Sequence, residues 1–288
     1  MKNKIKSVVY PVGGISNTIN DITELFELYM NGKDKIVINT SAQPNSIPHM
    51  GSITTIMCVF ALGQRLKTAY NKEVEIEFDE LENSTGKIVE IDGKKYVCSL
   101  NNCTLGNGLS KAEVYMSYYH DLFERLTAYS GINYRIRTYK NYQEQNIVRD
   151  TIVKIMTDYD FFAQLLSPKD KRLHFRIQCP KCGVANKTYN ELFHAVLDDN
   201  VRFEACCPIH GKYIVNVNKS NQDFLDMNTQ LRDLTKGVLL NSYNENILPI
   251  MLDGGDWAGV WTNRIHIRGL IRLCLLYTSD AADDLIGV

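Results

Sequence analysis

Apolar and polar positions recur with two different periods along the chain, and each change of period marks an expected element. Alternating or short apolar runs predict strands at 35–39, 73–78, 134–139 and 247–252. Apolar residues spaced three and four apart predict helices at 21–29, 52–70, 110–130, 143–166 and 222–236. Strands that alternate with helices are typical of a mostly parallel sheet with helices on both faces. We therefore expect an α/β fold built on a doubly wound parallel sheet.

Turn-forming residues divide this pattern further. Asp92-Gly93 lies between two short runs and predicts a β-hairpin over residues 87–98. Ser167-Pro168 is expected to end the helix before it, because a residue that precedes proline disfavours helical conformation. Gly237 is expected to end the helix over 222–236. Residues 174–217 carry several cysteines and are expected to form an insert of short strands.

Composition narrows the class of protein. The 288 residues are 44% hydrophobic and 23% charged, which is ordinary for a soluble globular protein. The formal net charge of -1 excludes a global basic field, so any contact with nucleic acid must come from a local patch. The first residues lack the apolar core of a secretory signal, and no apolar run has membrane-spanning length. We expect a cytoplasmic protein that makes no membrane contact.

Two similar cysteine motifs indicate a metal site. Cys179-Pro-Lys-Cys182-Gly and Cys207-Pro-Ile-His210-Gly share the form C-P-x-[CH]-G. Two ligands separated by two residues can hold one ion, and three thiolates with one imidazole favour tetrahedral zinc. Four protein ligands leave no open position, so the predicted zinc is structural. Cys206 could replace Cys207, but the repeated motif favours Cys207.

The other cysteines are expected to have no such role. Eight cysteines in a cytoplasmic chain favour metal ligands or free thiols over a disulfide framework. Cys98 and Cys103 are expected to be free thiols, although a second, weaker metal site there stays open. Cys58 lies on a helix and is expected to belong to the core.

An anion site is predicted where the first strand meets the following helix. Pro44 punctuates the turn after this strand, and His49 and Gly51 stand at the start of the helix with Ser52. Unpaired N–H groups and the helix dipole favour negative charge at such a helix N-terminus. His49 adds a hydrogen-bond donor, and Gly51 leaves room for a flat ligand against the backbone. This arrangement suits a nucleotide triphosphate.

Two acidic segments follow strands and are expected to face the same crevice. Asp256-Trp257 comes soon after the strand at 247–252, where carboxylates meet ligands in a doubly wound sheet. A tryptophan there offers a wall for an aliphatic chain, and the carboxylate can pair with a terminal charge. Asp79 follows the second strand and is a candidate for binding a cationic substrate. Glu80 and Glu82 are expected to stay solvated.

These motifs carry a family resemblance. Pro44-x-x-x-x-His49-x-Gly51-Ser52 resembles the HIGH signature of class I aminoacyl-tRNA synthetases, with Ser46 where glycine is usual and Ser52 in place of the second histidine. Asp256-Trp257-x-x-x-Trp261 resembles a block of the class I lysyl-tRNA synthetases, with Val260 in place of the usual arginine. The paired cysteine motifs lie between them in the family's order. The resemblance covers about residues 35–270.

The resemblance implies a fold and a reaction. The fold would be a Rossmann-like, HUP-type catalytic domain, its first half (1–173) and second half (218–273) separated by a zinc-ribbon insertion (174–217). The activity would be ATP- and Mg²⁺-dependent activation of an amino acid and its transfer to tRNA. Lysine is the preferred amino acid, and arginine, cysteine and glutamate stay open. Pro44, His49, Gly51 and Ser52 would bind ATP, with His49 and Ser52 acting in catalysis. The amino acid would lie against Asp79, Asp256 and Trp257.

The last residues suggest that the chain is a fragment. Residues 274–283 resemble the translation of a common sequencing-library adapter, so we expect the natural reading frame to end near Leu273. The family's KMSKS loop and anticodon-binding domain would then lie beyond it. We expect this fragment to bind ATP weakly and to activate no amino acid, whereas the complete gene product does. Oligomeric state is left open.

Three other functions remain open. A nucleotidylyltransferase also uses a His-x-Gly turn at a helix N-terminus, but it normally lacks both the zinc insert and the Asp-Trp block. A synthetase-like paralogue could modify something other than tRNA. A zinc-ribbon nucleic-acid binder is the non-enzymatic alternative, because a basic stretch precedes the first cysteine motif. That stretch comprises Lys169, Lys171, Arg172, His174 and Arg176.

Overall fold

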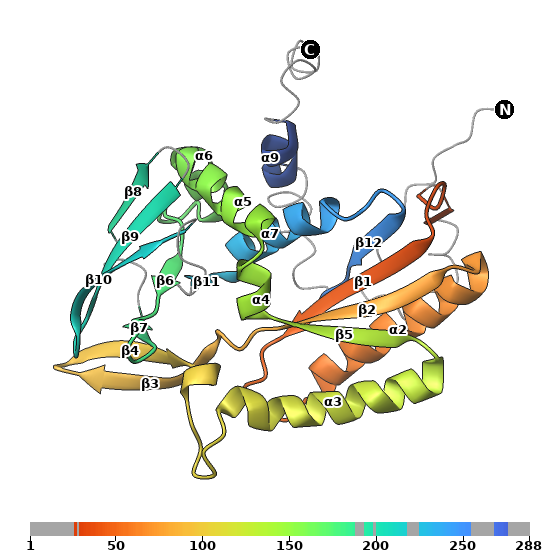
Figure 1. Ribbon diagram of the computed structural model, residues 1–288, viewed down its shortest axis with the longest axis horizontal. Coiled ribbons are helices and arrows are strands. Elements are labelled where there is room, and N and C mark those ends of the chain that lie inside the picture. The colour runs from red at the N-terminus through yellow and green to blue at the C-terminus, as the bar shows by residue number, and fades with distance from the viewer. Residues whose placement is uncertain are drawn as a thin grey trace.

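The computed structural model describes residues 26–27, 29–187, 193–197, 200–217, 225–254 and 268–275. Its centre is a four-stranded parallel sheet with the strand order β12-β1-β2-β5 (Figure 1). The four strands are β1 (Lys35–Ala42), β2 (Glu73–Glu80), β5 (Asn133–Thr138) and β12 (Ile247–Met251). All four predicted strands are therefore confirmed, and β1 continues three residues beyond its predicted end.

The order of the strands determines where a ligand can bind. Read from β5, the sheet runs third, second, first and fourth in chain order, which is consistent with the first four strands of a Rossmann-like sheet. The direction of winding reverses between β1 and β12. Ligands of open α/β sheets bind at the carboxyl ends of the strands at such a reversal. The crevice expected by topology therefore lies beside the ends of β1 and β12.

Two long helices cover one face of the sheet. They are α2 (Met50–Tyr70) and α3 (Lys111–Ser130), which lie together below the strands in Figure 1. Their apolar residues pack on the inward residues of β1 and β2 in a single core cluster that includes Ile38, Phe60 and Phe123. Ser110 and Glu113 form a reciprocal capping box at the start of α3. The predictions for these two helices are confirmed.

The helix expected over residues 143–166 is broken into shorter helices. Residues 143–166 are divided among three helices, which are α4 (Tyr139–Gln143), α5 (Asn146–Thr157) and α6 (Tyr159–Leu166). The prediction of a single helix is wrong, because Asp158 leaves helical geometry at φ -104 and ψ 46. The break lets α5 and α6 pack against each other in one apolar cluster.

The last long helix also differs from its prediction. A short strand, β11 (Leu225–Met227), occupies the expected first turn, and α7 (Thr229–Asn241) begins after it with Asn228 as N-cap. Gly237 does not end the helix. A Cβ atom at Gly237 would lie 3.1 Å from Leu270, so its lack of a side chain serves close packing there. Of the helix expected over 21–29, only fragments lie within the described residues.

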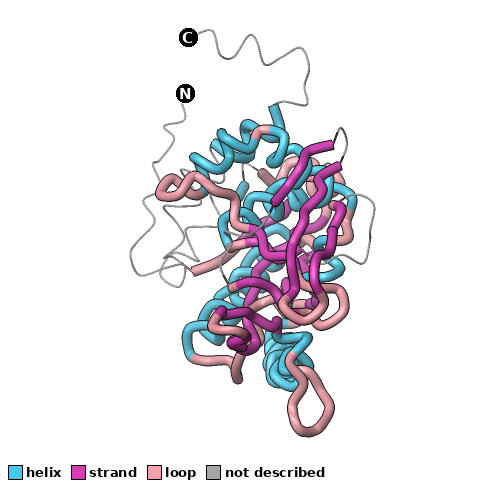
Figure 2. The backbone as a smooth tube through the Cα atoms, turned by 90° about the vertical axis from the view of Figure 1, so that its left-hand side faces the viewer, coloured by secondary structure: helices cyan, strands magenta, loops and turns pink. Residues whose placement is uncertain are grey.

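The cysteine-bearing insert joins the hairpin to form one lobe. The predicted hairpin is confirmed and comprises β3 (Thr85–Ile91) and β4 (Lys94–Ser99), with Asp92 and Gly93 at its tip, both at positive φ. It is followed by the 3-10 turn η2 (Leu100–Asn102). Figure 2 shows the lobe from its own side. The insert contains β6 (Phe175–Ile177), β7 (Val184–Asn186), β8 (Phe193–Leu197), β9 (Asn200–Cys207) and β10 (Gly211–Asn216).

The insert shares its core with helices α5, α6 and α7. One cluster of buried residues contains side chains from α5, α6 and α7 together with Phe175, Val201 and Val215 of the insert. This cluster crosses the boundary expected at residue 173. Strand β6 also pairs with β11, which lies after the insert. Among the described residues, no helix is both long and apolar enough to cross a membrane.

Charged side chains line the face of the sheet that α7 covers. Glu77 and Asp79 of β2 are 1% and 2% exposed. Arg137 of β5 lies 2.9 Å from Glu77 and 2.7 Å from Asp79, and Lys236 of α7 lies 3.2 Å from Asp79. Burial alone would raise the pKa of Asp79, but the charges of Lys236 and Arg137 lower it below its usual value. Ion pairing therefore fixes α7 on the sheet.

Replacing Lys236 with methionine tests this role. The substitution keeps an aliphatic chain of similar length but leaves Asp79 buried with one cation fewer. We expect a loss of about 3 kcal/mol in the free energy of unfolding, measured by urea denaturation. Lys169→Met, at an exposed position, is the control and should change stability by less than about 0.5 kcal/mol. Equal stability of the two variants would show that the ion pair does not hold α7.

Candidate functional site

The four predicted metal ligands come together at one point. Cys179 and Cys182 lie in the turn between β6 and β7. Cys207 is the last residue of β9, and His210 lies in the turn between β9 and β10. Their ligand atoms all lie within 4.8 Å of one another. Cys182 Sγ is 3.6 Å from Cys207 Sγ, and His210 Nδ1 is 3.6 Å from the Sγ atoms of Cys179 and Cys207. The two turns thus present three sulfurs and one nitrogen to a common centre.

These spacings fit a tetrahedral metal. Zinc bonds of about 2.3 Å to sulfur and about 2.0 Å to nitrogen place neighbouring ligand atoms about 3.5–3.8 Å apart at tetrahedral angles. Burial opposes ionisation of Cys207. Hydrogen bonds from the backbone N–H groups of Ile209 and His210, and from the side chains of His210 and Cys182, nevertheless lower the pKa of Cys207 to about 7. A thiolate is the form that binds metal. The Cys3His cluster can therefore hold a structural metal ion, and its donor set is compatible with zinc.

The remaining cysteines of the lobe lie outside this cluster. Cys206 is exposed, and its thiol contacts the carbonyl of Cys207 rather than the other ligands. The geometry therefore groups Cys207, and not Cys206, with the other three candidate ligands. Cys98 and Cys103 are free and buried, as expected. Cys58 on α2 is only half-buried.

His49 is the N-cap of α2. Its Nδ1 accepts hydrogen bonds from the backbone N–H groups of Gly51 at 3.1 Å and Ser52 at 3.4 Å. Because Nδ1 is an acceptor, a neutral ring carries its proton on Nε2, which is left to donate to a ligand. The side chain is exposed at the carboxyl end of β1, which is the end predicted by topology to border the crevice.

The other residues of this turn support the cap. A Cβ atom at Gly51 would lie 3.1 Å from the imidazole of His49, so glycine leaves space for the ring. The Ser52 hydroxyl donates to the His49 carbonyl at 2.9 Å. Pro44 is buried between β1 and α2. The structure therefore brings Pro44, His49, Gly51 and Ser52 together in one turn at the switch point.

The two neighbouring carboxylates of β2 have different environments. Asp79 is enclosed by Arg137, Lys236 and Asn39, so its oxygens are already engaged. Glu80 points to the opposite face by strand alternation, is half-buried, and has no hydrogen bond or ion pair within the described residues. Burial, aided by the charges of Glu82 and Glu113, raises the pKa of Glu80 to about 7. The sequence suggests Asp79 as the carboxylate that binds a cationic substrate. In the structure Asp79 is already paired, and the neighbouring carboxylate of Glu80 is the one left to bind a cation.

Glu82 differs from its prediction. It was expected to be solvated, but it is 6% exposed and accepts hydrogen bonds from the backbone N–H groups of Tyr139 at 2.7 Å and Lys140 at 2.9 Å. The expectation is wrong because the start of α4 needs an acceptor for these N–H groups. No local pattern near residue 82 reveals a partner more than fifty residues away.

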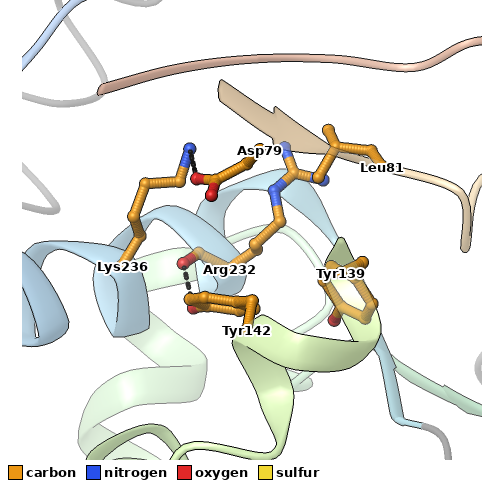
Figure 3. A pocket seen from close by; sticks show the side chains of 6 residues that line it. All are labelled: Asp79, Leu81, Tyr139, Tyr142, Arg232 and Lys236. Carbon is orange, nitrogen blue, oxygen red and sulfur yellow. Dashed lines mark hydrogen bonds and ion pairs between the residues drawn. The ribbon is translucent and has the colours of Figure 1, made fainter. Parts of the chain in front are cut away.

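The hollow beneath Asp79 is filled by the protein itself. Figure 3 shows Lys236 of α7 directed at Asp79, with Arg232, Tyr139, Tyr142 and Leu81 around them. The space between these side chains is too narrow for a water molecule. This region therefore stabilises the fold, and a ligand would have to bind on the outer side of the strand ends.

Only the first residues after β12, Leu252 to Gly254, are described beside the switch point between β1 and β12. Leu252 N–H donates to the carbonyl of Asn39 on β1 at 2.9 Å, which holds the two strand ends together. Asp253 follows and accepts from Gly254 N–H at 2.8 Å. Burial raises the pKa of Asp253. Asp256 and Trp257, predicted to contact the amino acid, lie outside the described residues.

Comparison with known proteins leaves the family open. No protein-family model matches the chain. No curated protein is similar enough to count as a match.

The cluster predicts one bound metal ion per chain. Purified protein, stripped with a chelator and titrated with Zn²⁺ or the spectroscopic probe Co²⁺, should bind one equivalent, with thiolate charge-transfer absorption for Co²⁺. Cys207→Ser should weaken binding by at least about a hundredfold, because it removes a ligand. Cys206→Ser should bind like the unaltered protein. Equal losses in the two variants would contradict the assigned ligand set.

Proposed function

We propose that this chain belongs to the catalytic domain of a class I aminoacyl-tRNA synthetase. The observation that carries the proposal is the position of the His49-capped N-terminus of α2 at the switch point of a Rossmann-like sheet. Helix N-termini at this point favour phosphate. A helix N-terminus alone supports only nucleotide binding. The proposal of amino-acid activation also rests on the HIGH-like motif and the Asp-Trp block, which occur in one chain with the Cys3His cluster.

The reaction would be adenylation of an amino acid. Its carboxylate attacks the α-phosphorus of ATP, an acyl-phosphate bond forms, and pyrophosphate leaves. Mg²⁺ would neutralise the phosphates in such chemistry. His49 Nε2 would donate to phosphate oxygens as their charge develops, and Ser52 would offer a weaker neutral donor. Gly51 would let the adenine lie against the backbone.

Glu80 is the best-placed residue for the ammonium group of the amino acid. It lies level with Ala42, the last residue of β1, on the sheet face covered by α2 and α3. Its carboxylate has no cation within the described residues, whereas that of Asp79 is neutralised by two. A half-buried carboxylate without a cation gains most from binding one. The amino acid would then span Glu80 and the phosphate site at His49.

Lysine remains the preferred substrate and tRNA the proposed acceptor. The lysine assignment rests on the resemblance of Asp256-Trp257 and of the paired cysteine motifs to the lysine-specific enzymes, and the tRNA assignment rests on the resemblance to the family as a whole. The Cys3His cluster would hold zinc in a structural role, because its four ligands leave no site for substrate.

A zinc-ribbon nucleic-acid binder is the weaker alternative. Of the basic stretch that suggested it, His174 is paired with Asp170 and Arg176 with Asp226. Lys169 and Lys171 are exposed. A binder of this kind would show RNA affinity that falls steeply with salt and no ATP binding.

Two measurements test the proposal. Isothermal titration of the 288-residue chain with ATP and Mg²⁺ should show weak binding, reduced about tenfold or more in His49→Ala, because one charge-assisted donor is lost. His120→Ala, exposed on α3, should bind ATP like the unaltered chain. On the complete gene product, ATP–pyrophosphate exchange should require one amino acid, and Glu80→Gln should raise KM for it more than KM for ATP.

Two results would overturn the proposal. The first is equal ATP affinity in the two histidine variants. The second is exchange without any dependence on the twenty standard amino acids. Exchange dependent on another carboxylate or a mononucleotide would instead favour the paralogue or the nucleotidylyltransferase.

A further inference from the structure

The first metal-binding turn packs directly on Asn102, a residue from a distant part of the chain. Gly183 closes this turn at φ +68, and a Cβ atom there would lie 2.4 Å from Asn102 Nδ2 and 2.5 Å from its Cγ. Asn102 Nδ2 also donates to Gln178 Oε1 at 2.9 Å. Gln178 precedes Cys179, so Asn102 contacts the chain on both sides of the first ligand pair.

Backbone pairing extends this contact. Strand β7, which follows Gly183, pairs antiparallel with β4 of the hairpin through Val184 and Cys98. The carbonyl of Val184 also accepts from the Cys179 N–H at 2.9 Å. The hairpin and the first metal-binding turn are therefore joined by main-chain hydrogen bonds as well as by Asn102.

The open end of the hairpin, next to Asn102, also contacts the segment that follows β2. Leu100 N–H donates to the carbonyl of Ser84 at 2.8 Å, and Asn101 N–H donates to that of Glu82 at 3.2 Å. The side chain of Glu82 in turn caps α4. A continuous series of contacts thus runs from the metal ligands through Asn102 to the carboxyl end of β2.

We propose that Asn102 is a positioning residue for the metal centre and that metal binding and ordering of the β3–β4 hairpin are coupled. Groups behind the ligands orient them and commonly change metal affinity by about 10–100-fold. Coupling of this kind is reciprocal, so a hairpin that strengthens metal binding is itself stabilised by the metal. Loading of the metal would then fix the segment Glu82–Ser84 beside the crevice. This inference rests on the metal assignment above and not on the proposed reaction.

The two glycines of the motifs provide a matched pair of variants. Gly183 and Gly211 both have positive φ, at +68 and +77, so alanine brings similar backbone strain at either position. A Cβ atom at Gly211 meets nothing within 4 Å, whereas one at Gly183 meets Asn102. We expect Gly183→Ala to lower Zn²⁺ affinity at least about tenfold more than Gly211→Ala. As a single substitution, Asn102→Ala should lower Zn²⁺ affinity. Combined with Gly183→Ala, it should restore part of the affinity that Gly183→Ala loses, because the clash with the Asn102 side chain is removed.

Hydrogen exchange measures the reciprocal effect. Zn²⁺ should slow amide exchange over residues 94–102 in the unaltered chain, and the effect should shrink in Asn102→Ala. Asn244→Ala, exposed in the turn before β12, is the control and should leave both affinity and exchange unchanged. Exchange in the buried part of α2 should not respond to the metal.

Each result has a defined meaning. Equal Zn²⁺ affinities for Gly183→Ala and Gly211→Ala, or hairpin exchange that ignores the metal, would overturn the coupling while leaving the metal assignment intact. An unaltered chain that binds no Zn²⁺ would overturn both. Neither result would bear on ATP binding at His49.

Discussion

The buried ion pair between Asp79 and Lys236 is the constraint on which the rest of the structure depends. Two carboxylates of β2 are removed from water, and such groups are tolerated in a protein interior only when paired. Their partners come from the next strand, through Arg137, and from α7, through Lys236. The pairing therefore determines where α7 lies, and α7 in turn closes one face of the sheet near the carboxyl ends of its strands.

The same constraint decides which side chains are left for a ligand. Asp79 belongs to the interior and Glu80, one residue later, points to the other face with its charge unpaired within the described residues. One face of the sheet, under α7, thus carries charged side chains that form ion pairs with one another, whereas the other face, under α2 and α3, is apolar. The exposed imidazole of His49 lies at the edge of the second face. Ligand chemistry is consequently expected on the side of α2, at the ends of β1 and β12.

Features that depend on neighbouring residues were predictable from the sequence. The strands, α2, α3, the Asp92-Gly93 turn and the two C-P-x-[CH]-G turns each follow from spacing within a few residues, and the structure confirms them. The cluster of Cys179, Cys182, Cys207 and His210 needed only the similarity of two motifs. Assignments to ATP, lysine and tRNA rest on resemblance and stay predictions.

Features that depend on distant partners were not predictable. Glu82 is buried because α4 begins beside it, Asp79 is neutralised by a lysine on α7, and Asn102 lies against a glycine eighty-one positions later. The break at Asp158 and the late start of α7 arise because packing in the shared core outweighs helix propensity. Nothing in the local sequence marks any of these pairs. The charged alternation of β2 indicated a polar face, but not that the face is buried and internally paired.

Photoaffinity labelling tests the proposed nucleotide site most directly. The 288-residue chain would be irradiated with an azido analogue of ATP, with and without excess ATP, and the labelled peptides identified by mass spectrometry. The account predicts protectable labelling within residues 42–52 or in the segment that follows β12. Protectable labelling confined to the metal-binding lobe, or to the hollow under Asp79 and Lys236, would contradict it.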